Sequence, residues 1–300
     1  MWSLTPPRRG FFFAVSWQLA RTALVAVALY AAPALAQGDP QRGLYISKAA
    51  GCLGCHTEAK QDAVPYAGGR ALNTAFGTFY GPNITPHPQN GIGGWTEAQF
   101  IRALRHGERP DGASYFPAFP YTSFTGMSDH DARDLWAYLR SLAPSPRTNR
   151  LHEIGFPYGW RPLVRVWKWL YFTPGPLHDD RQLSPPQNRG RYLVQALGHC
   201  GECHTPRNML GAMREDRFLA GARDAKDKKI PNLTPARLKS WTDAELRQFM
   251  QTGDTPDGDS VSESMAEVVR NTTSQLTPQD LAAMIAYLRA VPPIAEEDKK

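Results

Sequence analysis

The sequence lacks the glycine-rich motifs of nucleotide and flavin binding: neither Gly-x-Gly-x-x-Gly nor a P-loop occurs in its 300 residues. It also has few long hydrophobic runs. The extended apolar stretch from Thr22 to Ala32 is shorter than the roughly 20 residues that a membrane-spanning helix needs. These absences argue against an oxidoreductase with its own nucleotide cofactor, and against a protein that crosses a membrane several times.

Cysteine is equally scarce, and its placement is the strongest signal in the chain. All four cysteines fall into two copies of Cys-x-x-Cys-His, which is typical of c-type haem attachment. Two thiols would form thioethers with each haem, and the adjacent imidazole would bind its iron. The sequence thus predicts two covalent haem c groups, held by Cys52, Cys55, His56, Cys200, Cys203 and His204. The alternative is two redox or zinc-type cysteine pairs, each followed by an unrelated histidine.

Residues 1–36 have the features of a secretory signal peptide. Arg8 and Arg9 open the segment, an apolar stretch follows Arg21, and Ala34-Leu35-Ala36 is a small-x-small cleavage site. We expect the mature chain to begin at Gln37, with an uncleaved signal anchor as the alternative. Because haem c is attached outside the bacterial cytoplasm, the signal and the haem motifs both predict a periplasmic protein.

The formal net charge of +6 overstates the basic character of the mature protein. Three of the 34 Lys and Arg residues lie in the predicted signal peptide, whereas all 28 Asp and Glu residues lie beyond it. The propionate groups of two haems would bring the net charge close to zero. The charge therefore gives no reason to expect binding to nucleic acid or to an anionic membrane surface.

The chain repeats one unit of sequence. Arg42-Gly43-Leu44-Tyr45 precedes the first haem motif, and Arg189-Gly190-Arg191-Tyr192 precedes the second. Pro82-Asn83-Ile84-Thr85-Pro86 likewise returns as Pro231-Asn232-Leu233-Thr234-Pro235. We expect two tandem domains of one fold, each with one haem. The predicted boundaries are 1–36 for the signal peptide, 37–143 for domain 1, 144–186 for a connector, 187–293 for domain 2 and 294–300 for a polar tail.

Each repeat is predicted to be helical. Asp39 is a cap followed by proline at the first helical position. Thr96 and Thr242 begin capping boxes, and Ser128 and Thr277 begin the last helix of each repeat. Segments rich in Gly and Pro, such as 68–94, are expected to be ordered loops and not strands. The predicted fold class is all-α, with loop-rich haem pockets.

Residues 144–186 belong to neither repeat and are rich in proline and aromatic residues, among them Trp160, Trp167 and Trp169. One interpretation is a connector that packs its aromatic side chains between or over the domains. The other is a docking surface for a partner subunit, because exposed aromatic residues with Arg favour interfaces. The sequence does not tell which aromatic side chains are exposed.

The sixth ligand of the second iron is expected to be a methionine, which gives a six-coordinate carrier of relatively high potential. Met250 and Met284 lie on apolar helix faces, where methionine is normally part of the core. Met209 and Met213 follow the haem motif on its proximal side. Met265 lies in a predicted loop between the two later helices, where a distal ligand should arrive, and is the expected ligand.

The sixth ligand of the first iron has more than one candidate. Met127 is the methionine of domain 1, and it is the preferred ligand. By the internal repeat it aligns with Leu276, directly before a helix cap, where a hydrophobic staple residue belongs. Another residue, such as His87, His106 or His130, is a second option, and an open or weakly liganded iron is a third.

Longer strings resemble one protein family. Tyr192-Leu193-Val194 and the run from Gly198 to Asn208 are similar to the second domain of the cytochrome c subunits of membrane-associated alcohol dehydrogenases. Gly81 to Pro86 and Gly91 to Trp95 are similar to their first domain. The resemblance runs from about 37 to 293 and implies two class I cytochrome c folds. Those subunits commonly have three haem domains, so this chain is more similar to shorter dihaem relatives that accompany aldehyde or N-heterocycle dehydrogenases.

One string departs from the family pattern. Its Pro-Ala-Met-Pro-Tyr, whose methionine is an axial ligand in the family, stands here as Pro117-Ala118-Phe119-Pro120-Tyr121. Phe119 cannot bind iron, which puts the ligand set and the potential of the first haem in question. Met265 does match the ligand position of the family's second haem.

We expect an electron-transfer subunit that has no substrate of its own and is not an enzyme by itself. The resemblance implies a separate periplasmic or membrane-associated dehydrogenase as electron donor, and ubiquinone or a terminal oxidase as acceptor. Peripheral association with the membrane is left open. The alternative is a dihaem enzyme of the peroxidase or thiosulfate dehydrogenase type, because an open first iron would bind and activate a small molecule. A gas or redox sensor is a third option, although the sequence shows no output domain.

Overall fold

The structure is a computed structural model that describes Trp2, residues 38–261 and residues 263–296. The chain divides into two units, Met1–Gln37 and Gly38–Lys300, and every element described below belongs to the second. Apart from Trp2, the predicted signal peptide and its cleavage site lie outside the described residues. Within the described residues, no helix is both long and apolar enough to cross a membrane.

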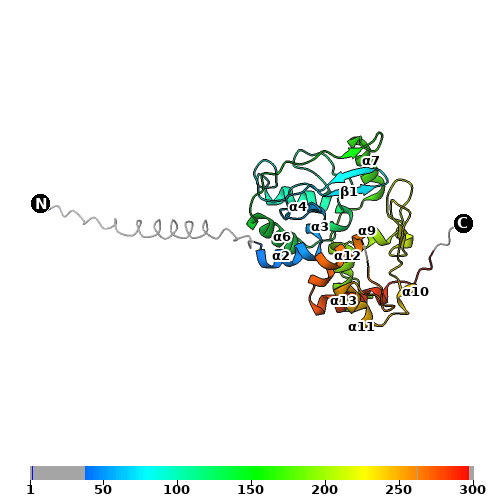
Figure 1. Cartoon of the computed structure of the whole chain (residues 1–300). Coiled ribbons are helices and arrows are strands. Elements are labelled where there is room, and N and C mark those ends of the chain that lie inside the picture. Colours follow the sequence, from blue (N-terminus) through cyan, green and yellow to red (C-terminus); the bar gives the residue numbers. More distant parts are fainter. Residues whose placement is uncertain (1, 3–37, 262, 297–300) are drawn as a thin grey trace. The chain divides into compact units, whose positions relative to one another are not determined.

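The first repeat combines helices with a small hairpin (Figure 1). Its elements are α2 (Pro40–Ala49), α3 (Cys52–His56), β1 (Ala71–Thr74), β2 (Gly77–Tyr80), α4 (Glu97–His106), α5 (Tyr121–Phe124) and α6 (Asp129–Ser141). The connector follows with β3 (Glu153–Ile154) and α7 (Arg161–Tyr171).

The second repeat follows the same order of helices. It begins with α8 (Pro185–Arg191), which continues into a π-helical segment, η1 (Tyr192–Leu197). The remaining elements are α9 (Gly201–His204), η2 (Glu215–Arg217), β4 (Ala222–Arg223), β5 (Lys229–Ile230), α10 (Pro235–Leu238), α11 (Asp243–Thr252), α12 (Glu263–Asn271), η3 (Thr273–Gln275) and α13 (Pro278–Ala290).

The predicted helix starts are confirmed. Thr96 and Thr242 both form reciprocal capping boxes with the residue three positions further on. The carboxylate of Asp39 accepts hydrogen bonds from backbone N–H groups in the first turn of α2. Ser128 and Thr277 cap α6 and α13 in the same way. Local sequence thus determines where these helices begin.

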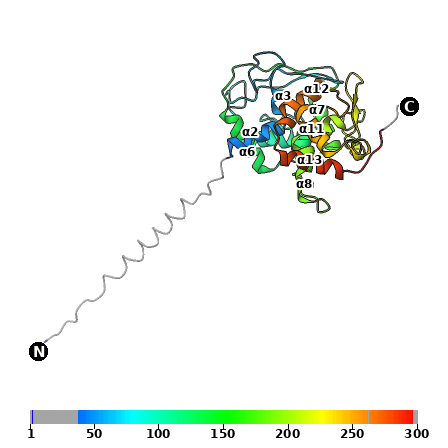
Figure 2. The same cartoon turned by 60° about the horizontal axis from the view of Figure 1, so that its bottom comes forward.

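The first and last helices of each repeat cross at a glycine. α2 lies against α6, and α8 lies against α13, as Figure 2 also shows. A Cβ atom on Gly43 would lie 1.9 Å from the carbonyl oxygen of Asp134. A Cβ atom on Gly190 would lie 1.9 Å from the carbonyl oxygen of Ala283. No side chain fits at either crossing, which explains the glycine in the repeated Arg-Gly-x-Tyr string.

Short strands correct the all-α prediction, because the fold is mostly helical but also contains two small sheets. Within 68–94, which was expected to be loop, β1 and β2 pair as an antiparallel hairpin, and β3 of the connector pairs with β2. Gly77 allows the turn with a φ of 126°. β4 and β5 form a second hairpin. The third strand comes from residues more than seventy positions away, so local sequence did not reveal the pairing.

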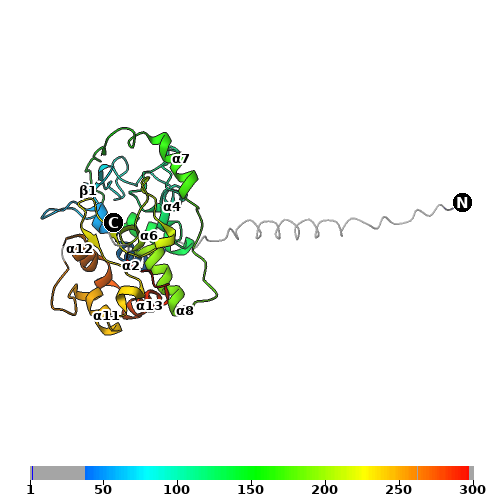
Figure 3. The same ribbon diagram turned by 90° about the vertical axis from the view of Figure 1, so that its right-hand side faces the viewer.

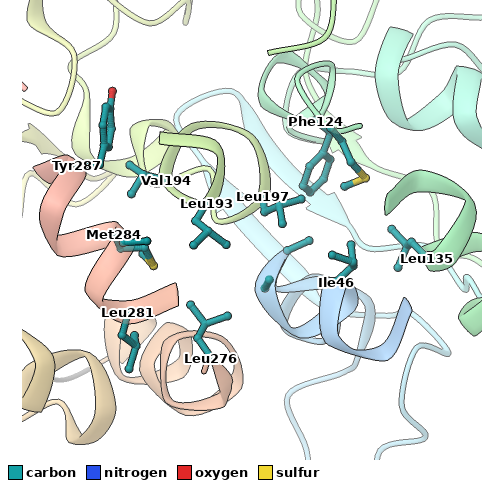
Figure 4. Packing of buried hydrophobic residues seen from close by; sticks show 14 of the residues in the cluster. Ile46, Phe124, Leu135, Leu193, Val194, Leu197, Leu276, Leu281, Met284 and Tyr287 are labelled. Atoms are coloured by element: carbon teal, nitrogen blue, oxygen red, sulfur yellow. The ribbon is translucent and has the colours of Figure 1, made fainter. Parts of the chain in front are cut away.

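One hydrophobic core spans both repeats. Figure 4 shows Leu193 and Leu197 of the second repeat between Ile46 of α2 and Met284 of α13. Leu197 is fully buried, and burial of each such side chain is worth roughly 1.5–3 kcal/mol. The two repeats therefore pack around one common hydrophobic core.

Two tyrosine–aspartate pairs join the repeats reciprocally. The hydroxyl of Tyr45 in α2 donates to the carboxylate of Asp280 in α13, and that of Tyr192 donates to Asp131 in α6, both at 2.6 Å. Each hydroxyl also accepts the backbone N–H of the N-cap residue of the opposing helix. Each repeat thus offers the same donor and the same acceptor, which gives the contact an approximate twofold symmetry.

The connector packs over domain 1. Arg147 donates two hydrogen bonds to the carboxylate of Glu58, at 2.8 and 2.9 Å. Val164 of α7 is buried in a small cluster with Phe79 and Phe116. Figure 3 shows α7 on the outside of the described unit. Because Trp169 nevertheless remains 82% exposed, packing over the domain does not account for every aromatic side chain.

Candidate haem sites

Each Cys-x-x-Cys-His motif forms a short helix that follows a residue with left-handed backbone. Gly51, before α3, has a φ of 61°. His199, before Cys200 and α9, has a φ of 38°. Residues three apart on a helix lie on one face, so the two cysteines of each motif lie side by side with the histidine next to them. This is the arrangement that two thioethers and one axial ligand on the same haem require.

A backbone carbonyl orients the imidazole of each motif. His56 Nδ1 lies 2.8 Å from the carbonyl oxygen of Pro82, and His204 Nδ1 lies 2.7 Å from that of Pro231. A carbonyl oxygen only accepts, so Nδ1 carries the proton and donates it. Nε2 then has a free lone pair and would be the iron ligand. Burial lowers the pKa of both imidazoles, which keeps them neutral and able to ligate.

The repeated Pro-Asn-x-Thr-Pro string holds these carbonyls in place. The buried amide of Asn83 donates to two backbone carbonyls at the start of the connector, at 2.9 and 3.0 Å. Asn232 donates to the carbonyl of Ile294 at 2.7 Å. Gly81 brings the string against the first motif, because a Cβ atom there would lie 1.8 Å from the carbonyl oxygen of Cys55.

Burial raises the pKa of the thiols in both motifs. All four cysteines are free. Burial raises the pKa of Cys52 and Cys200 to about 12 and that of Cys55 to about 11. Redox-active and metal-binding cysteines need a thiolate, which is favoured by a lowered pKa. The raised pKa speaks against a redox-active thiolate, whereas a metal ion would itself deprotonate these thiols; the oriented imidazole beside each pair is what fits a covalently attached haem.

Met265, the expected ligand of the second iron, does not lie in a loop. It occupies the first turn of α12 and is partly buried. The loop prediction was wrong because Met265 and Val269, four residues apart, continue an amphipathic helix across this segment. Its role as a ligand stays a prediction.

Met127, the preferred ligand of the first iron, is fully buried in the core that both repeats share. Its backbone N–H donates to the carbonyl of Phe124 between α5 and α6. Phe119, which replaces the family's methionine, packs against the same core. This setting suits a staple residue as well as a ligand, so Met127 also stays a prediction.

The alternative histidine ligands are engaged elsewhere or lie at the surface. His130 Nδ1 lies 2.9 Å from a carboxylate oxygen of Asp134, and its Nε2 lies 3.0 Å from a guanidinium nitrogen of Arg42. Both of its ring nitrogens are therefore occupied. His87 accepts backbone N–H groups with its Nδ1. His106 ends α4, and burial lowers the pKa of its imidazole.

Each haem motif also contacts the opposite repeat. Glu202, between the cysteines of the second motif, accepts hydrogen bonds from the hydroxyls of Thr122 and Ser123 in α5, at 2.7 and 2.8 Å. On the other side of the boundary, α12 of the second repeat lies against α3, the helix of the first motif. A Cβ atom on Gly54 in the first motif would lie 3.7 Å from the Glu267 carboxylate. The two haem attachment sites are thus neighbours across the boundary between the repeats.

An ion pair reinforces this boundary. Arg70 of the first repeat donates to Glu267 at 2.6 Å, and both side chains are mostly buried. After burial, the charge of Glu267 is the largest influence on the Cys55 thiol, and Cys203 of the other motif also acts on it. No sequence pattern indicated these contacts, because they depend on how the repeats dock.

The comparison with protein families agrees with this geometry. The model of the cytochrome c family matches residues 41–143 and 187–292. The chain belongs to the cytochrome c family. Each matched segment contains one of the two motifs, so the chain carries two covalently bound haem c groups.

Several curated proteins are similar over most of this chain. The "Diheme cytochrome c-type" protein of Cereibacter sphaeroides is 46% identical over 261 residues, which cover 86% of this chain and 87% of the relative. The "Fructose dehydrogenase cytochrome subunit" of Gluconobacter japonicus is 40% identical, covering 85% of this chain and 53% of the relative. The "Alcohol dehydrogenase (quinone), cytochrome c subunit" of Gluconobacter oxydans is 35% identical, covering 93% and 61%.

The last of these relatives confirms the resemblance found in the sequence. This chain spans little more than half the length of the two dehydrogenase subunits, and most of the length of the dihaem protein. The similarity therefore reaches both haem domains, while the longer relatives have further sequence that this chain does not match.

Proposed function

We propose that this protein is an electron-transfer subunit that takes electrons from a separate dehydrogenase and passes them to the respiratory chain. The observation that supports this best is the contact of each haem motif with the opposite repeat, because two neighbouring haems form a short path for electrons. Relatives named as cytochrome subunits of dehydrogenases support a dehydrogenase as the donor.

The residues of this chain would hold the haems and set their surroundings. When bound, each haem iron takes up and releases one electron. His56 and His204 would bind the irons through Nε2, and the prolyl carbonyls would keep their rings in place. The surrounding core would limit the access of water to the haems, and burial together with the sixth ligand would set the potential of each iron.

The proposal extends to the cell compartment and the electron acceptor. A periplasmic location rests on the predicted signal peptide at residues 1–36 and on the place where haem c is attached. The proposed acceptor is a quinone or a terminal oxidase. Peripheral contact with the outer face of the inner membrane belongs to the same proposal.

The alternative of a dihaem enzyme has less support. It rests on Phe119, which removes the family's methionine ligand from the first haem. None of the three relatives described above is named as a peroxidase or a thiosulfate dehydrogenase. We therefore propose no catalytic residue in this chain.

The test uses oxidised, purified holoprotein and the envelope fraction of a source strain that lacks its gene. Alcohols, aldehydes, sugars and N-heterocycles are supplied in turn, and reduction of the haems is followed optically. We expect reduction that requires both the fraction and one class of substrate. Heat-treated fraction is the control. Substrate oxidation by the purified protein alone, or turnover of peroxide or thiosulfate without a partner, would overturn the proposal.

A further inference from the structure

α7 of the connector directs its apolar face away from the protein. At 100° per residue, Leu163, Val166, Trp169 and Leu170 lie on one side of this helix. Their exposed fractions are 38%, 53%, 82% and 51%, respectively. A surface helix normally shows the reverse pattern, with its apolar side chains buried.

The cations of α7 face inward instead. Arg161 donates to the carbonyl of Ser114 at 2.7 Å, and its guanidinium lies over the ring of Phe116. The ammonium of Lys168 donates to the carbonyl of His106 at 2.5 Å, and its side chain is only 14% exposed. The connector thus uses its polar groups to fix α7 on domain 1, which leaves the apolar side outermost.

The apolar surface continues from α7 onto domain 2. Trp167 Nε1 donates to the carbonyl of Leu210 at 2.8 Å, which ties the helix to the loop after the second haem motif. In that loop Met209 is 95% exposed and Leu210 is 53% exposed. We call the surface formed by Leu163, Val166, Trp169, Leu170, Met209 and Leu210 the connector face.

The connector face lies close to the string that departs from the family pattern in domain 1 and to the loop after the second haem motif. Behind it, Val164 packs on Phe116, directly before the string that replaces the family's ligand segment of the first haem. Only the thickness of one helix, about 10 Å, separates the face from that string. The loop of Met209 is joined to the second motif, because Arg207 donates to the Glu202 carboxylate at 2.5 Å. A redox partner seated on this face would therefore be near the second haem motif, which is itself the neighbour of the first.

We propose that the connector face is the docking surface for the catalytic subunit of the partner dehydrogenase. This inference rests on the proposed function. Trp and exposed Met are enriched at the cores of protein interfaces, and Trp is a frequent hot-spot residue. The six side chains of the connector face are between 38% and 95% exposed, so a partner that covered them would remove a large apolar surface from water.

The charges favour a protein partner over a lipid surface. A helix that lies on an anionic membrane carries several Lys or Arg residues beside its apolar face, where they meet the headgroups. In α7 two of the three cations are committed to carbonyls of domain 1, and Arg165 is the cation that remains exposed. The face therefore suits a desolvated contact with protein.

The test compares Val166→Asp with Val64→Asp. The two valines have nearly the same exposure, 53% and 54%, but Val64 lies outside the connector face. Each tagged holoprotein is produced in the gene-deletion strain and extracted in mild detergent. Native gels are stained for haem and for substrate-dependent dehydrogenase activity. We expect wild type and Val64→Asp to migrate with that activity, and Val166→Asp to migrate alone with substrate-driven haem reduction slowed at least about tenfold.

A photo-crosslinking residue in place of Trp169 keeps the test valid if Val166→Asp fails to bind haem. We expect it to crosslink to the catalytic subunit, and the same residue in place of Val64 to give no such product. If Val166→Asp remains in an active complex, the docking surface lies elsewhere and the proposed function stands. If wild type migrates with no dehydrogenase activity and no substrate reduces its haems, the proposed function itself fails.

Two further outcomes would also overturn the inference. Val166→Asp could retain the complex but lose binding to vesicles of phosphatidylethanolamine and phosphatidylglycerol, which would make the face a membrane surface. Alternatively, the substitution could only separate two copies of this chain in size-exclusion chromatography, which would make the face a self-contact.

Discussion

The reciprocal tyrosine–aspartate pairs predict an unequal response to the same substitution. Tyr45→Phe removes one hydrogen bond from Asp280, but Arg189 still donates to both carboxylate oxygens, at 2.8 and 2.7 Å. Tyr192→Phe removes the 2.6 Å bond to Asp131 Oδ2; Arg42 then donates to the other oxygen at 3.4 Å, and Arg189 acts on this carboxylate through its charge. Tyr192→Phe therefore leaves the Asp131 carboxylate with weaker hydrogen-bond partners than Tyr45→Phe leaves to Asp280.

The expected losses follow from these remaining partners. A typical hydrogen bond contributes about 0.5–1.5 kcal/mol, whereas a buried group left without an adequate partner costs about 1–3 kcal/mol. We expect Tyr45→Phe to lower the free energy of unfolding by about 1 kcal/mol and Tyr192→Phe by about 2 kcal/mol. For a unit of this size, the difference corresponds to a Tm lower by about 2–4 °C.

Thermal unfolding of the holoproteins, followed by far-UV circular dichroism, measures this difference. Tyr158→Phe is the matched control, because Tyr158 lies on the connector and is 49% exposed. We expect it to unfold like wild type. If Tyr45→Phe proves as destabilising as Tyr192→Phe, or more so, the argument from remaining partners is wrong.

Three further predictions concern the haems and the acid stability. Met265→Ala is expected to abolish the methionine–iron charge-transfer absorption of the second haem and to lower its potential; optical spectra and redox titration unchanged from wild type would exclude Met265 as the ligand. Met127→Leu is expected to lower the potential of the first haem, whereas an unaltered potential would assign Met127 to packing alone. Hydrogen bonds from Arg147 and Lys60 hold the pKa of Glu58 at about 2, below the roughly 4.3 of an unfolded chain. The stability that Glu58 contributes is thus present above about pH 4 and is lost as the pH falls toward 2. In urea titrations over this pH range, the free energy of unfolding should fall more steeply in wild type than in Glu58→Gln. Parallel curves for the two proteins would contradict this.

Much of the haem attachment could be predicted from sequence because its chemistry is local. Two cysteines and a histidine within five residues define each motif, and a threonine with an acidic or amide residue three positions later defines a helix start. The repeated strings, such as Arg-Gly-x-Tyr, also indicated two copies of one fold. They did not indicate why Gly43 is required, since that depends on the backbone of α6.

The contacts between the repeats could not be predicted, because they join residues far apart in the chain. The sequence pattern assigned no role to Glu202, which accepts hydrogen bonds from Thr122 and Ser123 of the other repeat. The hairpin of β1 and β2 is local, and it was missed because the Gly and Pro around it were interpreted as loop signals; only its pairing with β3 of the connector joins distant residues. The exposure of Trp169 could likewise not be predicted from the sequence, because it depends on which side of α7 packs on domain 1.

The reciprocal use of Tyr45 and Tyr192 has a consequence for the origin of this architecture. A contact in which each half offers the same donor to the same acceptor is the kind that two identical chains make around a twofold axis. The two repeats thus have the geometry of a homodimer of single-haem proteins whose genes were joined end to end. In such a dimer the two halves must change together, whereas in one chain each half can diverge. Phe119 in one half, where the other half has Met265, is a difference of that kind.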